Sequence, residues 1–208
     1  MKRSTLIALK TLTWIGCLWP FADLVWGAVT NNLGPDPTAE IANTTGLTAL
    51  WMLAATLAIS PVRKLSPRLA WLIKFRRLIG LFVFFYAVLH MLTWVALYNN
   101  FSIGAMLDDV TKRRFIMAGA AAWLLLLPLA LTSTNRAIRW LGGKNWNRLH
   151  MLIYPAALCA MVHYWWKVKT GVLSPAPFTL VLVVLLLARP ILAWTQKRKQ
   201  RAVVAQAR

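Results

Sequence analysis

Acidic residues are scarce in this sequence: five Asp and Glu stand against 24 Lys and Arg, which gives a net charge of +19. Charged residues of both signs make up 14% of the chain, whereas soluble domains average roughly 25%. Apolar residues make up 59%, and the mean hydropathy is +0.58. This balance excludes an ordinary soluble domain and indicates a polytopic membrane protein.

Several sequence motifs of enzymes and metal sites are also absent. The two cysteines, Cys17 and Cys159, stand far apart in apolar runs and form no CxxC pair, which gives no support to a disulfide or a zinc site. There is no GxGxxG dinucleotide fingerprint, HExxH motif, nucleophile elbow or carboxylate pair. We therefore expect this chain to carry no NAD(P)H-binding Rossmann domain and to leave substrate chemistry to a partner.

Apolar stretches long enough to cross about 30 Å of hydrocarbon recur along the chain. Connectors rich in Gly, Pro and Asn separate them, and no internal repeat or linker to a second domain is recognisable. The sequence predicts an all-α membrane protein, a six-transmembrane-helix bundle forming one domain over residues 1–208. The predicted spans are roughly 11–29, 46–62, 76–98, 115–132, 148–166 and 177–196.

The basic residues give the orientation, because Lys and Arg gather in cytoplasmic connectors. With both termini in the cytoplasm, 19 of the 24 basic residues fall inside. Three of the five outside, Lys112, Arg113 and Arg114, follow Asp108 and Asp109, which partly offset them. The positive charge is therefore a topology signal, and nucleic acid is excluded as a partner.

All three histidines stand in apolar runs. His90 and His163 lie about 20 Å and 22 Å along their helices from the cytoplasmic end. Two imidazoles at similar depth on neighbouring helices suit the axial ligands of a b-type haem. His150 lies about 20 Å below His163, rotated by roughly 140° on the same helix, and it could bind a second haem, belong to an inner cofactor site, or bridge two helices by a hydrogen bond.

Three arginines are expected near the inner end, beside His150: Arg76, Arg77 and Arg148. One interpretation is anchoring, with the charged groups reaching to the membrane surface. The other is a site for haem propionates, a flavin phosphate or a quinone, because guanidinium groups bind such anions in a forked geometry. Gly80 could let a flat ring approach its helix or could serve helix packing.

Three segments together resemble the MsrQ (YedZ) family of haem-binding membrane subunits, within the ferric-reductase-like transmembrane group. They are RRLIGLFVFFYAVLH (76–90), LTSTNRAIRWLGGKNWNRLHMLIY (131–154) and MVHYWW (161–166). The likeness covers nearly the whole chain. His90, His150, His163, Arg76 and Arg77 match the family's positions, whereas Asn43 stands where some relatives carry a histidine.

The resemblance implies a b-type cytochrome of the bacterial inner membrane that binds haem b and FMN. It implies that electrons come from quinol or a cytosolic flavin reductase. They would pass to MsrP, a periplasmic molybdopterin enzyme that reduces methionine sulfoxide in oxidised proteins. Two alternatives stay open: a stand-alone cytochrome that reduces metal chelates, and a redox-silent scaffold whose histidines only bridge helices.

Overall fold

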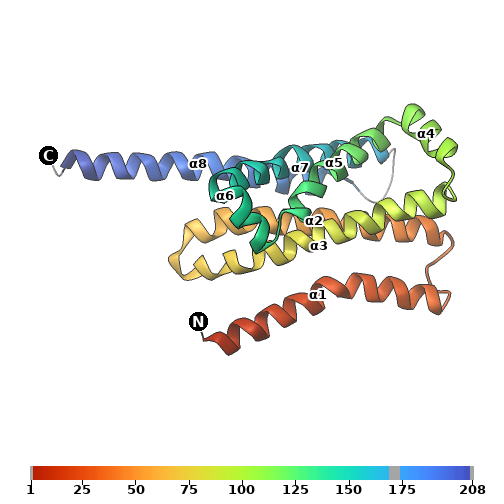
Figure 1. Ribbon diagram of the computed structural model, residues 1–208, viewed down its shortest axis with the longest axis horizontal. Coiled ribbons are helices and arrows are strands. Elements are labelled where there is room, and N and C mark those ends of the chain that lie inside the picture. Colours follow the sequence, from red (N-terminus) through yellow and green to blue (C-terminus); the bar gives the residue numbers. More distant parts are fainter. Residues whose placement is uncertain (1, 169–173, 207–208) are drawn as a thin grey trace.

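The protein is all-helical throughout the residues that the computed structural model describes, 2–168 and 174–206 (Figure 1). The elements in chain order are α1 (Arg3–Val29), α2 (Pro37–Leu65), η1 (Pro67–Leu72), α3 (Ile73–Leu92), η2 (Thr93–Tyr98), α4 (Ile103–Lys112), α5 (Arg114–Leu131), α6 (Asn135–Leu149), η3 (His150–Leu152), α7 (Ile153–Lys167) and α8 (Ala176–Gln206). The predicted all-α class is confirmed.

Among the described residues, four helical stretches are long and apolar enough to cross a membrane: Arg3–Val29, Pro37–Leu65, Arg68–Tyr98 and Arg114–Leu131. The other two predicted spans lie on shorter apolar helix, α7 with its preceding η3 and the segment Ala176–Leu192 of α8. The start of α1 and the end of α8 lie at the same end of the molecule (Figure 1), as an even number of crossings requires. The count of six and the cytoplasmic placement of both termini stay predictions.

Two connectors expected to interrupt the helices are themselves helical. The segment LGGKNWNR lies within α6, which continues through a kink at Gly142, where φ is 72°. Glycine adopts this left-handed conformation without a steric penalty, so the chain turns there and the helix resumes. The second such helix, α4, begins after Ser102, whose hydroxyl accepts a hydrogen bond from the backbone N–H of Ala105.

Asp109 links α4 to η2, the helical segment that continues α3. Its carboxylate accepts a hydrogen bond from Trp94 Nε1 at 3.0 Å and pairs with Arg113 at 3.2 Å. Lys112 pairs with Asp108 on the same helix. These pairs bear out the expectation that the two aspartates offset the basic run at this end.

The core lies among α2, α3, α5, α7 and α8. Helix α2 packs chiefly on α3, and α5 packs chiefly on α7. Leu53, Leu57, Val83, Ala157 and Leu182 are almost fully buried where these helices meet. The bundle therefore consists of two tightly packed helix pairs side by side, which places the interior faces of α3 and α7 toward each other.

Helix α1 lies at the edge of the bundle (Figure 1) and packs on α3 through a small second core that includes Cys17, Phe82 and Tyr86. Proline at position 20 removes one backbone donor inside α1. One position on, the Tyr86 hydroxyl accepts from the N–H of Phe21 at 3.1 Å and donates to the carbonyl of Cys17 at 2.7 Å. It thereby stands in for the helical bond between residues 17 and 21.

We expect Tyr86→Phe to loosen α1 without unfolding the core. The change removes two buried hydrogen bonds, each contributing about 1 kcal/mol. Thermal melting in mild detergent should show a lower Tm for this variant. Tyr98→Phe, which removes a hydroxyl from a half-exposed ring, is the matched control. Equal melting of both variants and wild type would contradict the bridging role of Tyr86.

Candidate functional site

His90 on α3 and His163 on α7 meet in the interior of the bundle. Their ring centroids are 5.9 Å apart, and the ring planes are nearly perpendicular, at 87°. The similar depth predicted from the sequence thus corresponds to direct ring-to-ring proximity. A metal–imidazole nitrogen bond is about 2.0–2.1 Å, so a single metal atom between the two rings is compatible with this spacing.

Each of these imidazoles is fixed by a backbone carbonyl. The Nδ1 atom of His90 donates to the carbonyl of Ala42 at 2.9 Å, and Nδ1 of His163 donates to the carbonyl of Phe115 at 2.6 Å. A carbonyl can only accept, so the proton of each neutral ring is on Nδ1 and the lone pair is on Nε2. Metal-binding histidines are typically oriented in this way.

A glycine lies against each histidine. Gly46 and Gly119 stand one helical turn after Ala42 and Phe115, the residues whose carbonyls accept. A Cβ at position 46 would lie 3.1 Å from His90 Nδ1, and one at position 119 would lie 2.7 Å from His163 Nδ1. Any larger residue would therefore push the ring away from its carbonyl.

The two halves of the site repeat the same arrangement. Both hydrogen bonds join residues 48 positions apart, and in both the glycine follows the carbonyl residue by four positions. The pairs α2–α3 and α5–α7 thus each supply one carbonyl, one glycine and one histidine. The repeat is not recognisable in the sequence, because only the glycine and the histidine recur between the two helix pairs.

His150 lies apart from this pair, at the junction of α6 and α7. Its Nε2 is 3.2 Å from the Thr132 hydroxyl, which itself donates to the carbonyl of Pro128 at 2.6 Å. The imidazole therefore donates through Nε2, the nitrogen that His90 and His163 leave free. Its ring stacks on Trp146 with centroids 3.8 Å apart, and Arg76 is close enough to act on it electrostatically.

The other two arginines occupy different positions. Arg77 donates from Nη1 to Asn135 Oδ1 at 2.6 Å, joining α3 to the start of α6. Arg148 is exposed on the last turn of α6. The structure thus brings Arg76 to His150 and Arg77 to Asn135 at the end of the bundle that the sequence predicts to be the inner one, and it leaves Arg148 at the surface.

Gly80 lies next to Thr56 on α2. The nearest atom to a Cβ built at Gly80 is the methyl group of Thr56, at 4.0 Å. This is an ordinary van der Waals distance, so an alanine would fit there, and Gly80 differs from Gly46 and Gly119. The two roles considered for Gly80, helix packing and the approach of a flat ring, both stay predictions.

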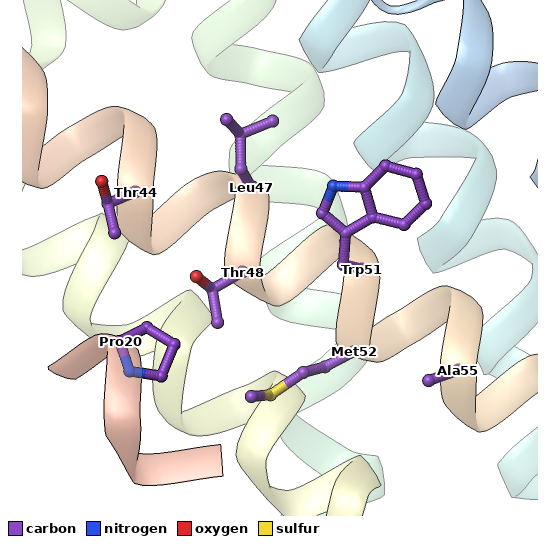
Figure 2. A pocket seen from close by; sticks show the side chains of 7 residues that line it. All are labelled: Pro20, Thr44, Leu47, Thr48, Trp51, Met52 and Ala55. Carbon is purple, nitrogen blue, oxygen red and sulfur yellow. The ribbon is translucent and has the colours of Figure 1, made fainter. Parts of the chain in front are cut away.

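A groove of about 560 Å³ runs between α1 and α2 (Figure 2). It faces away from the histidines, because Thr44 and Gly46 are two positions apart on α2 and point about 200° apart. Most of its lining is apolar, so we assign it to the lipid-facing surface. The lining residues are Pro20, Thr44, Leu47, Thr48, Trp51, Met52 and Ala55.

The sequence interpretation missed four residues around the histidine pair: Gly46, Gly119, Asn43 and Lys167. Asn43 was considered only as a missing histidine, yet its side-chain oxygen accepts a hydrogen bond from Lys167. A signal for the glycines was present in the shared spacing between glycine and histidine. For Asn43 and Lys167 no sequence signal existed, since they lie 124 positions apart.

We expect Gly119→Ala to disturb the site more than Gly46→Ala, because the added methyl group meets its histidine at the shorter distance. Spectra of ¹⁵N-histidine-labelled protein should show partial loss of the Nδ1–H tautomer and a lower Tm. Gly80→Ala is the control and should be neutral or slightly stabilising, since alanine favours helix by about 1 kcal/mol over glycine. Equal behaviour of all three variants would contradict the tight contact.

Comparison with known proteins agrees with this helical arrangement. The family described as ferric reductase like transmembrane component matches residues 45–161, which include His90 and His150. The chain is 43% identical over 200 residues to the protein-methionine-sulfoxide reductase heme-binding subunit MsrQ of Herminiimonas arsenicoxydans, covering 95% of this chain and 91% of that protein.

A second relative has the same name and comes from Xanthomonas axonopodis pv. citri (strain 306). It is 46% identical over 192 residues, with 89% of this chain and 87% of that protein covered. Similarity of this extent runs through all the helices that build the histidine site. The chain therefore belongs to the MsrQ family, within the ferric-reductase-like transmembrane group.

Proposed function

We propose that this chain binds one b-type haem between His90 and His163. It would pass electrons across the bacterial inner membrane to a periplasmic, MsrP-type protein-methionine-sulfoxide reductase. The observation that carries the proposal is the pair of facing imidazoles, each with Nδ1 held by a carbonyl. The relatives' names, which describe a heme-binding subunit of that reductase, support the choice of cofactor and partner.

The residues present fit a haem better than a bare metal ion. Among the described residues no group of three or more His, Cys, Asp or Glu could hold a metal, whereas a haem needs only axial ligands from the protein. The Nε1 donor of Trp123, one turn from Gly119 on α5, is buried without a described partner, and such donors call for an explanation. A ligand bound in the bundle interior would supply one.

In this proposal the chain's residues hold the haem and orient its ligands, and the haem supplies one-electron oxidation and reduction. His90 and His163 would hold the iron through Nε2, the nitrogen that the carbonyl contacts leave free. The carbonyls of Ala42 and Phe115 keep both rings in the binding tautomer. Substrate chemistry takes place on the partner enzyme, so the chain acts as an electron-transfer subunit.

We assign the inner cluster to the electron donor's side and not to a second haem. His150 has no second histidine to pair with, because His90 and His163 are paired with each other. Its Nε2 is also committed to Thr132. With Arg76, Arg77 and Arg148 it offers positive charge and an aromatic surface to a quinol or to a flavin phosphate. FMN itself rests on the family resemblance alone.

We expect the wild type, purified in mild detergent, to contain one haem b per chain by pyridine haemochrome assay. His90→Ala and His163→Ala should each abolish the reduced-minus-oxidised spectrum, because each removes an axial ligand. His150→Ala is the matched control and should keep the full haem content. Two haems in the wild type and half of that content in His150→Ala would establish a second, inner haem.

A colourless, well-folded wild type would favour the scaffold alternative. The partner is tested separately, in proteoliposomes supplied with a quinol. The wild type should support reduction of oxidised methionine by added MsrP-type enzyme, and His163→Ala should not. Reduction of a ferric chelate at the outer face without any added protein would favour the stand-alone reductase.

A further inference from the structure

Lys167 closes the outer end of the histidine site. It is the last residue of α7, one helical turn beyond His163. Its ammonium group donates a hydrogen bond to the side-chain oxygen of Asn43 on α2. Asn43 directly follows Ala42, whose carbonyl holds His90, so this contact joins the two helices that flank the pair.

Within the described part of the chain, Lys167 differs from Lys112 and Arg113 in having no carboxylate beside it to neutralise its charge. At the same end of the molecule, Lys112 pairs with Asp108 and Arg113 pairs with Asp109. The partner of Lys167 is a neutral amide, and within residues 2–168 and 174–206 it makes no ion pair. Its ammonium group acts electrostatically on both His90 and His163.

We propose that Lys167, held in place by Asn43, raises the reduction potential of the haem that His90 and His163 bind. This inference rests on the proposed haem site. An oxidised haem carries one more positive charge than a reduced one, so a nearby fixed positive charge favours the reduced form. Lys167 is therefore a positioning and tuning residue and does not bind the iron.

Because Lys167 lies on the outer side of the histidine pair, its charge affects the direction in which electrons move. Electrons that enter near His150 and leave at the outer end must be accepted at the His90–His163 site. A positive charge beyond that site draws electrons outward. Because Lys167 is partly exposed, water and salt screen its charge, and we expect a moderate effect.

The test is a spectroscopic redox titration of the purified wild type, Lys167→Gln and Asn43→Asp. The second variant keeps the lysine but places a carboxylate against it, so each variant lowers the net charge by one at the same place. We expect each to shift the reduced-to-oxidised ratio at a given potential by about tenfold, which for one electron is about 59 mV, toward the oxidised form.

Two controls separate charge from structure. Lys167→Arg keeps the charge and should titrate like the wild type. Lys112→Gln removes a positive charge at the same end that is already paired with Asp108, and it should change the potential less than Lys167→Gln does. Haem content, measured on each sample, shows whether the proposed haem site itself is intact.

A full haem content with a potential equal to that of Lys112→Gln, in either Lys167→Gln or Asn43→Asp, would overturn the role of Lys167. The haem site would stand in that case. Absence of haem from the wild type would instead refute the proposed function, so the two failures are distinguishable.

Discussion

An imidazole inside a membrane bundle needs a partner for its N–H group, and the rest of this site depends on how that need is met. A polar group left unsatisfied in hydrocarbon costs several kcal/mol. Helix backbone offers few acceptors, because its carbonyls already bond within the helix. Here Ala42 and Phe115 each accept a second hydrogen bond, from His90 and His163. In each ring, one hydrogen bond thus satisfies the Nδ1–H group, fixes the tautomer and orients the lone pair on Nε2.

The glycines follow from the same constraint. A Cβ at the position four residues after each of these two carbonyls would crowd the donating ring, so glycine there gives the imidazole access to the carbonyl. Gly46 and Gly119 provide this access, and both halves of the bundle use it at the same spacing. Close packing of α2 on α3 and of α5 on α7 therefore positions the two rings. Helix α1 contributes no residue to these contacts and is joined to α3 through Tyr86.

Much of this arrangement could be predicted from the sequence, and the remainder has identifiable causes. Apolar run length and helical rise located the helices and matched His90 with His163 in depth. Helix α6 lies between the predicted spans 115–132 and 148–166, where a connector rich in Gly and Asn was expected, because Gly142 kinks the chain and the helix resumes. The contact of Lys167 with Asn43 was out of reach, since it depends on how α7 lies beside α2.

In the function proposed for this chain, His90 and His163, both oriented by carbonyls, would together hold one haem iron. Electron paramagnetic resonance of the oxidised protein tests it directly, because iron with two histidine axial ligands is low-spin. We predict a single low-spin haem signal in the wild type, replaced by a high-spin signal or lost when His163 is changed to alanine. A high-spin signal in the intact wild type would contradict the account, since it would show that at least one of the two imidazoles does not bind.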